Sequence, residues 1–231
     1  MAAGAARPAE PLLALPAAER LLVAELFVSL QGESTHAGRP CFFIRLTGCH
    51  LRCGWCDTAY AFHGGSWWRV ADLVAEAARQ GLPLVEVTGG EPLLQPGVFP
   101  LLATLADAGH EVLLETSGSL DISGIDPRVR RIVDLKCPGS GEVAANRWEN
   151  LAHLRASDEL KFVVADEADY LWAREVIREH GLGARCPVHL SPVHGALDLP
   201  SLAAWILRDR LPVRLTLQQH KLIWGAEAKG V

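Results

Sequence analysis

The chain has 231 residues, of which 49% are hydrophobic, and its 22 Lys and Arg against 27 Asp and Glu give a formal net charge of −5. A chain of this length and composition can bury a sizeable core, which excludes a disulfide-dependent miniprotein, a collagen-like repeat and a disordered acidic chain. No basic block stands out, so the charge does not favour a nucleic-acid partner.

The first residues, 1–20, are rich in Ala and Pro and predict a flexible extension, followed by a single domain at 21–231. The apolar part of the extension is too short and too often interrupted by Pro for a secretory signal, and no apolar span of about 18 residues follows it. These features predict a cytoplasmic protein with no membrane partner, in a compartment where thiols stay reduced.

Apolar runs alternate with amphipathic segments along the domain. Strands are predicted, in chain order, at 22–30, 41–47, 84–87, 111–115, 132–135, 160–164, 188–190 and 213–217. Helices are predicted at 70–79, 100–108, 170–177 and 202–207. This alternation predicts an α/β fold with about six βαβ units and a parallel sheet, as either a partial, open barrel or a doubly wound sheet.

Polar and Gly-rich residues repeatedly follow the predicted strands. Examples are Arg45 after the second strand, residues 88–91 after the third, and residues 134–136 after the fifth. In parallel α/β folds the carboxyl ends of the strands are where ligands bind, so we expect these residues to share one site.

Three of the six cysteines lie within eight residues, at Cys49, Cys53 and Cys56. Thiols this close in sequence cannot all pair with one another, whereas thiolates suit zinc or an iron–sulfur cluster. Three ligands on one loop leave one iron of a [4Fe–4S] cluster open, but a fourth ligand such as Cys137 or a histidine would complete a zinc site. The remaining cysteines, Cys41, Cys137 and Cys186, lie in apolar or Pro-containing contexts and predict buried thiols.

The cysteine loop reads Cys-x3-Cys-x-Trp-Cys, and Thr88-Gly-Gly-Glu-Pro92 follows it after one predicted strand. Together these motifs resemble the radical S-adenosylmethionine (SAM) enzymes. The resemblance implies a partial parallel (β/α)6 TIM-like barrel, a [4Fe–4S] cluster on Cys49, Cys53 and Cys56, and SAM bound at the open iron. Gly90 suits a close approach of the backbone to the cofactor, and the carboxylate of Glu91 suits its ammonium group.

Further segments resemble one family within this superfamily, the 7-carboxy-7-deazaguanine synthases, over nearly the whole chain after the extension. They are Phe27 to Glu33, Gly38 to Pro40, Phe43 to Cys49, Cys56 to Thr58, Asp134 to Ser140, Glu159 to Val163 and Gln218 to Gly225. The resemblance implies a lyase that converts 6-carboxy-5,6,7,8-tetrahydropterin to 7-carboxy-7-deazaguanine and ammonia, on the route to 7-deazapurine nucleosides such as queuosine.

The resemblance also implies roles for individual residues. Substrate contacts are expected from Leu30, Gln31, Gly32, Arg45, Thr88 and His220. SAM contacts are expected from Trp55, Asp57, Gly90, Glu91, Ser117, Asp134, Lys136 and Ser191. Thr58 matches the position of a Mg²⁺ ligand, and the guanidinium of Arg45 suits the pterin carboxylate.

The expected partners are the pterin, an electron donor such as flavodoxin or ferredoxin, and a second copy of the chain in a homodimer. Three other functions remain open. A glycyl-radical activase shares the cysteine and Gly-Gly-Glu motifs but acts on a protein. A zinc-binding interaction module does not bind SAM, and a simple electron carrier has no need of Arg45, Thr58 or the Gly-Gly-Glu turn.

Overall fold

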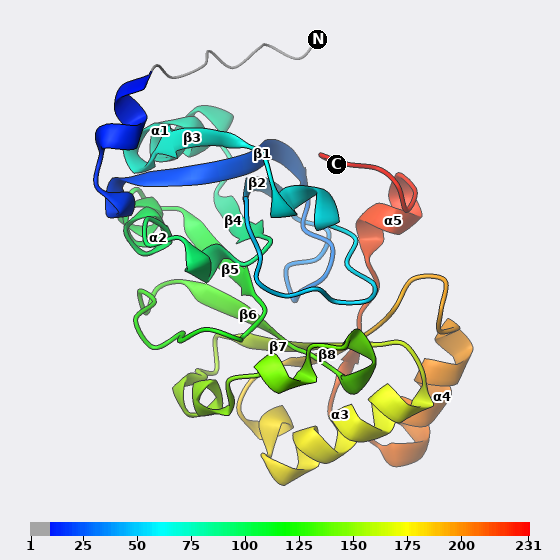
Figure 1. Cartoon of the computed structure of the whole chain (residues 1–231). Helices are drawn as coiled ribbons and strands as arrows, with labels where there is room; N and C mark the ends of the chain where they lie inside the picture. The colour runs from blue at the N-terminus through cyan, green and yellow to red at the C-terminus, as the bar shows by residue number, and fades with distance from the viewer. Residues whose placement is uncertain (1–9) are drawn as a thin grey trace.

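Within residues 10–231, the part of the chain that the computed structural model describes, the strands form one nine-stranded sheet (Figure 1). Its order is β3-β1-β2-β4-β5-β6-β7-β8-β9. The strands are β1 (Arg20–Leu30), β2 (Pro40–Leu46), β3 (Ser66–Arg69), β4 (Leu84–Gly89), β5 (Glu111–Thr116), β6 (Arg130–Leu135), β7 (Glu159–Val164), β8 (Val188–Pro192) and β9 (Arg214–Leu215). The α-helices are α1 (Val70–Gln80), α2 (Val98–Asp107), α3 (Glu167–Glu179), α4 (Leu199–Asp209) and α5 (Gln219–Ile223).

Every pair of neighbours from β2 to β9 is parallel, whereas β1 pairs antiparallel with both β2 and β3. The sheet is not closed, because β3 and β9 stand at opposite ends of the strand order. This arrangement confirms the predicted α/β fold with a partial, open parallel barrel. The short strand β3 and the short helix α5 lie where the sequence predicts no element, and β9 is shorter than the strand predicted at 213–217.

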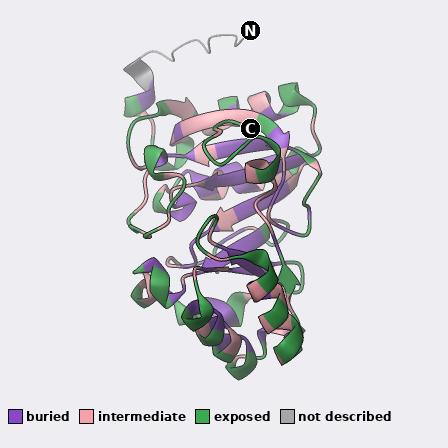
Figure 2. Ribbon diagram, turned by 90° about the vertical axis from the view of Figure 1, so that its right-hand side faces the viewer, coloured by how far each residue is buried: buried purple, intermediate pink, exposed green. Residues whose placement is uncertain are grey.

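Side chains alternate between the two faces of the sheet, as the pleat of a strand requires. On β2, Phe42, Ile44 and Leu46 pack in the larger core, while Cys41 and Phe43 pack in a smaller cluster on the other face. Figure 2 shows the strands largely buried and the helices exposed on their outer sides. The smaller cluster fills part of the barrel interior, which also carries buried polar side chains such as Glu86, Glu159 and His189.

Residues 31–39, which connect β1 to β2, close the amino-terminal end of the barrel. The backbone N–H of Thr35 donates to Glu159 Oε2 over 2.9 Å, and His36 Nε2 lies 3.0 Å from Glu111 Oε1. Glu111 and Glu159 are the first residues of β5 and β7, so this loop spans the barrel floor. Its first residues reach the cavity at the opposite end.

The predicted extension is described from residue 10 onward, and residues 1–9 lie outside the described part. Residues 10–19 contain two short 3-10 helices, Glu10–Ala14 and Ala17–Glu19. Leu12 is buried, and its carbonyl oxygen accepts a hydrogen bond of 3.3 Å from the Arg20 guanidinium. Packing thus begins before residue 21, and the division of the chain into an extension and one domain stays a prediction.

A buried ion pair between Arg131 and Asp158 stabilises the fold away from the carboxyl ends. Asp158 Oδ1 accepts from both the backbone N–H and Nε of Arg131, at 3.1 and 3.0 Å, and both side chains are buried. Replacing Asp158 with alanine leaves the guanidinium buried without its carboxylate, so we expect the free energy of unfolding to fall by about 3–5 kcal/mol. Urea titration followed by circular dichroism measures this loss. The partly exposed pair of Arg128 and Asp126 provides the comparison, because Asp126→Ala is expected to cost much less.

Candidate active site

A cavity of about 250 Å³ opens at the carboxyl ends of the parallel strands. It is lined by most of the residues that the sequence singles out: Leu30, Gln31, Gly32, Arg45, Cys49, Cys53, Trp55, Cys56, Asp57, Thr58, Thr88, Gly90, Ser117, Asp134, Lys136 and His220. These residues come from strands and loops far apart in the chain, and the parallel sheet brings their ends together. Glu91 and Ser191 do not line the cavity.

The cysteine loop lies against the Gly-Gly-Glu turn. The backbone N–H groups of Gly90 and Glu91 donate to the carbonyl oxygens of Leu46 and Gly48, over 3.2 and 2.8 Å. A Cβ at Gly90 would lie 2.2 Å from the Gly48 carbonyl oxygen and 2.8 Å from Cys49 Cβ. Glycine is therefore required at this position for the turn to touch the residues that begin the cysteine loop.

Cys49, Cys53 and Cys56 are free thiols that line the same cavity. Among residues 10–231, no three His, Cys, Asp or Glu side chains converge on one point where a single metal ion could bind. A zinc site requires such convergence, whereas each cysteine of an iron–sulfur cluster binds a separate iron. Three thiols on one loop supply donors of the kind that a [4Fe–4S] cluster uses.

The residues that follow the cysteine loop are tied to α5. Thr58 Oγ1 donates to Asp57 Oδ1 over 3.0 Å, while Asp57 Oδ2 accepts from Lys221 Nζ and Gln218 Nε2 at 2.7 and 3.1 Å. Partial burial raises the pKa of Asp57, but these donors outweigh it and hold that pKa well below its usual range. Asp57 is thus ionised beside Thr58, and the ammonium of Lys221 offsets its charge.

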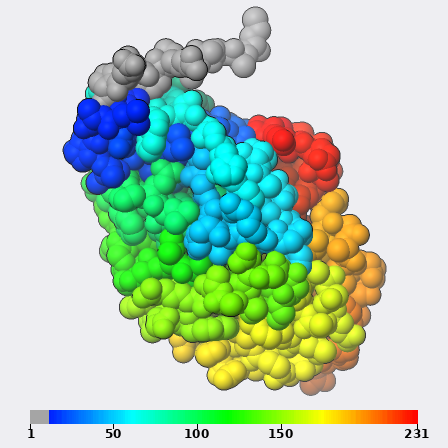
Figure 3. All heavy atoms as spheres, viewed as in Figure 1, coloured from blue at the N-terminus to red at the C-terminus, as the bar shows by residue number. Residues whose placement is uncertain are grey.

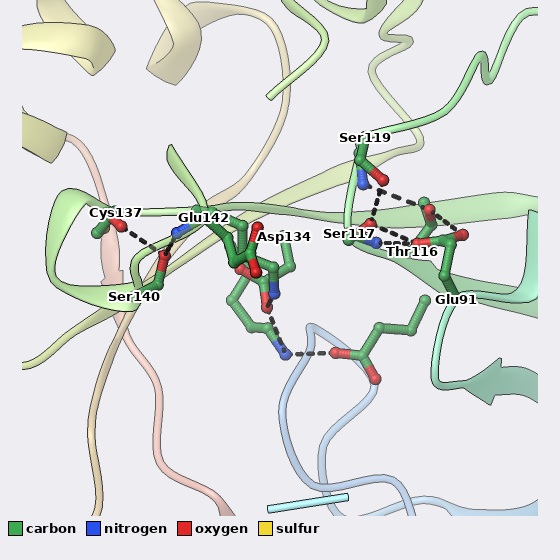
Figure 4. Close-up of polar contacts among 12 residues, drawn as sticks. Glu91, Thr116, Ser117, Ser119, Asp134, Cys137, Ser140 and Glu142 are labelled. Carbon is green, nitrogen blue, oxygen red and sulfur yellow. Dashed lines mark hydrogen bonds and ion pairs between the residues drawn. The ribbon is translucent and has the colours of Figure 1, made fainter. Parts of the chain in front are cut away.

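Glu91 has a different place from the one its predicted role requires. Its side chain is fully buried, and its carboxylate accepts from Leu93 N–H, Thr116 Oγ1 and Ser117 N–H at 3.0, 2.8 and 2.8 Å. Ser117 Oγ adds a further contact of 2.5 Å (Figure 4). The sequence assigns this carboxylate to the cofactor ammonium, but the protein already uses both oxygens, so Glu91 holds Ser117 in position instead. Ser191 is buried on β8 beside its register partner Val163, which lines the cavity, and its contact with SAM stays a prediction.

The carboxylate of Asp134 is the acidic group with a free oxygen beside the cysteine loop. Asp134 Oδ2 accepts from Lys136 Nζ over 2.8 Å, whereas Asp134 Oδ1 is buried and has no hydrogen-bond partner among the described residues (Figure 4). A buried acceptor without a donor is costly unless a ligand supplies one. The unpaired oxygen therefore indicates a bound donor group in this part of the cavity.

Four charged residues that the site prediction omits form the inner wall of the cavity: Glu33, Glu86, Glu115 and Lys161. Lys161 Nζ lies 3.0 Å from Glu33 Oε2 and also contacts Glu115. Burial raises the pKa of Glu115, but Lys161 outweighs this effect and lowers it overall. The signal in the sequence is the period of two along β4 and β5, which puts Glu86 on the same face as Thr88 and leaves Glu115 near it.

Arg45 presents its guanidinium to the cavity. Its Nε donates to Glu25 Oε1 over 2.6 Å, and the same oxygen accepts from the Tyr60 hydroxyl over 2.7 Å. No described residue hydrogen-bonds to the two Nη groups of Arg45, which remain available to a ligand. Its Cζ lies 5.7 Å from the centroid of Phe27, whose ring stacks on Phe43 at 4.8 Å.

The carboxyl-terminal segment completes the wall. Figure 3 shows it beside the segment that contains the cysteine loop. Ala226 and residues 228–231 line the cavity, and Lys229 Nζ lies 4.6 Å from the ring centroid of Tyr60. His220 Nδ1, on α5, lies 3.9 Å from Glu33 Oε1, and Gly32 packs against Gln219. The sequence predicts a role for His220 but none for the residues after it.

Comparison with known proteins relates this site to a family. A profile described as the radical SAM superfamily matches residues 43–138. A 7-carboxy-7-deazaguanine synthase of Chlorobaculum tepidum is 47% identical over 215 residues, which cover 91% of this chain and 97% of the relative. The chain belongs to the 7-carboxy-7-deazaguanine synthase family of radical SAM enzymes. A second member, from Koribacter versatilis, is 46% identical over 90% of this chain and 99% of its own.

Solved structures agree with this family. The crystal structure of QueE from Escherichia coli matches with a TM-score of 0.71 and 25% identity, covering 86% of this chain and 94% of QueE. SuiB of Streptococcus suis, bound to S-adenosylmethionine, matches with a TM-score of 0.53 at 12% identity, covering 74% of this chain and 48% of SuiB, and shares the fold alone. Membership confirms the predicted cofactors of the family: a [4Fe–4S] cluster, SAM and Mg²⁺. No helix among residues 10–231 is long and apolar enough to cross a bilayer.

Proposed function

We propose that this chain converts 6-carboxy-5,6,7,8-tetrahydropterin to 7-carboxy-7-deazaguanine and ammonia. The observation that carries the proposal is one cavity lined by the three cluster cysteines together with Arg45 and the Gln31-Gly32-Glu33 turn. When bound, the cluster and SAM supply hydrogen-atom abstraction from the substrate. The chain itself orients the reactants, balances charge and keeps water out.

On the cofactor side, Cys49, Cys53 and Cys56 would hold the cluster. Gly90 lets the Gly-Gly-Glu turn pack against Gly48 and Cys49, at the start of the cysteine loop. The free Asp134 Oδ1 replaces Glu91 as the acceptor for a donor group of SAM, and Lys136 holds the other oxygen. Glu91 orients the Ser117 hydroxyl from beneath the cavity wall.

On the substrate side, the free Nη edge of Arg45 suits a bidentate contact with the pterin carboxylate. Glu25 fixes the guanidinium from behind, and the stacked rings of Phe27 and Phe43 provide an apolar wall for a flat heterocycle. Thr88, Leu30, Gln31, Gly32 and His220 complete this side. Glu33, Glu115 and Lys161 supply both donors and acceptors to the polar edge of the ring.

Thr58 is assigned to Mg²⁺, beside the anionic Asp57. Thr58→Ala is expected to raise the Mg²⁺ concentration needed for half-maximal product formation by about tenfold, because a weak oxygen ligand is lost while the charge of Asp57 remains. Titration of Mg²⁺ in the product assay measures the shift. Formation of 5′-deoxyadenosine without Mg²⁺ is expected to be unchanged, and a wild-type Mg²⁺ titration for the variant would contradict the assignment.

We further propose that a flavodoxin or ferredoxin reduces the cluster, that the chain acts in the cytoplasm and that it forms a homodimer. Exposed Cys56 supports the first of these, because the cysteine loop borders solvent and gives an electron donor access. Measurement of the mass in solution tests the dimer.

An anaerobic assay tests the main proposal. Reconstituted protein is mixed with dithionite, SAM, Mg²⁺ and 6-carboxytetrahydropterin, and the products are identified by mass spectrometry. We expect 7-carboxy-7-deazaguanine. Formation of deoxyadenosine without this product would exclude the pterin as the substrate and favour an activase that acts on a protein. Absence of both, in protein with its cluster, would overturn the radical chemistry as well.

A further inference from the structure

Glu86 is a buried acid in the cavity wall with a single hydrogen-bonding partner among the described side chains. Its exposed fraction is 2%, and Gln31 Nε2 donates to Glu86 Oε2 over 3.2 Å. Glu86 lies on β4, two residues before Thr88, and so faces the cavity rather than the helices. None of the roles assigned above uses it.

Gln31 transmits this contact to the backbone of the next turn. Gln31 Oε1 accepts from the backbone N–H groups of Glu33 and Ser34, both at 3.1 Å. The backbone of Gln31 also pairs with the far end of the loop, because its N–H donates to Arg39 O at 2.9 Å and its O accepts from Gly38 N–H at 2.7 Å. The amide of Gln31 is thus the point where the loop across the barrel floor joins the cavity.

The turn fixed by Gln31 holds Glu33 in the cavity wall, beside Lys161 and Gln218. Glu33 Oε2 contacts Lys161 Nζ, while its other oxygen accepts from Gln218 Nε2 over 3.1 Å. A displaced turn would move Glu33 away from Lys161 and from α5 together. We propose that Glu86 is a positioning residue for the substrate, whose carboxyl group fixes Gln31 and, through it, the turn that carries Glu33 to Lys161. This proposal rests on the proposed function for the identity of the substrate.

The charges around Glu86 favour its neutral form. The carboxylates of Glu33 and Glu115 face it, the single ammonium of Lys161 offsets them, and the Cys41 thiol on β2 carries no charge. Burial, reinforced by Glu115, raises the pKa of Glu86 to about 8. Ionisation above this pH adds a third carboxylate to a wall that must admit an anionic substrate, so binding of the pterin is expected to weaken there.

The raised pKa of Glu86 also makes the free energy of unfolding depend on pH, and this can be measured without enzyme activity. Between the ordinary value of 4.5 and about 8, folded protein keeps a proton on Glu86 that unfolded protein releases. Glu86 therefore makes the folded state less stable as the pH rises through this range, and its contribution levels off above it. Glu86→Gln cannot titrate but retains an acceptor for Gln31 Nε2.

The test compares wild type with Glu86→Gln and Glu86→Ala, and uses Glu76→Gln on α1, which does not line the cavity, as the control. Hydrogen exchange of the peptide covering residues 31–39 is expected to be about tenfold faster in Glu86→Ala, because the Gln31 amide loses its buried partner. Glu86→Gln is expected to exchange at the wild-type rate. Relative to Glu86→Gln, the stability of wild type and of the control is expected to fall from about pH 6 to about pH 8.

In the product assay, the KM of wild type for the pterin is expected to rise above about pH 8, and that of Glu86→Gln to rise much less. The proposal is overturned if exchange in Glu86→Ala matches wild type. It is also overturned if stability and KM depend on pH in the same way in wild type and in Glu86→Gln. If wild type forms no deazaguanine, the proposed function fails, while the exchange and stability results still decide the role of Glu86.

Discussion

Cys53→Ala is expected to abolish both the bound cluster and the formation of 5′-deoxyadenosine. Three thiols on one loop provide the whole cysteine donor set of the cavity. The other cysteines, Cys41, Cys137 and Cys186, are buried outside the cavity. Burial raises the pKa of these thiols, to about 11 for Cys186, but it also raises the pKa of Cys49 and Cys53, so it is their place outside the cavity that excludes them as ligands. No described cysteine can therefore replace Cys53.

The measurement combines iron content and visible absorption of the reconstituted variant with mass spectrometry of its products. Cys186→Ala is the matched control, since it removes a thiol of the same type from the far side of the fold and is expected to retain cluster and activity. A Cys53→Ala protein that binds four irons and cleaves SAM at the wild-type rate would show that the cluster is held elsewhere.

Most strands of the sheet were predictable because each contains an apolar run that the sheet buries, whereas β3, which is short and largely exposed, was not predicted. The same pattern locates the site, since the polar residues that follow these runs must meet at one edge of a parallel sheet. Arg45 and Thr88 illustrate this: they are register partners on neighbouring strands β2 and β4, and both line the cavity. Local sequence was sufficient for these residues because strand direction alone determines where they lie.

The role of Glu91 could not be predicted in the same way. Its motif indicates a carboxylate near the cofactor, but the donors that occupy it, on Thr116 and Ser117, come from the end of the neighbouring strand β5. Conversely, Glu33, Glu115 and Lys161 meet only through long-range packing, which no short motif encodes. The terminal segment after α5 has no hydrophobic period at all, so its position beside Tyr60 depends on tertiary contacts alone.

Arg45→Ala is expected to lower kcat/KM for the pterin by about a hundredfold, or about 3 kcal/mol, while deoxyadenosine continues to form. The guanidinium is held by Glu25 at Nε and is mostly buried, so its free edge meets the substrate without reorganisation. Removing it leaves the substrate carboxylate without a partner and places the unpaired carboxylate of Glu25 beside it. Both effects oppose substrate binding, whereas neither touches the cysteine loop.

Arg45→Lys tests whether a positive charge at this position is sufficient or the planar guanidinium is required. Lysine retains the positive charge but cannot contact Glu25 and a carboxylate through one planar group, so we expect an intermediate loss of kcat/KM. Arg69→Ala, at the exposed start of α1, is the control for removing an arginine outside the cavity. Steady-state kinetics with the pterin, together with the ratio of deoxyadenosine to deazaguanine, gives the result. Wild-type kinetics for Arg45→Ala would show that Arg45 does not bind the substrate. The assignment of the cluster to the three cysteines would stand, because these residues act on a different reactant.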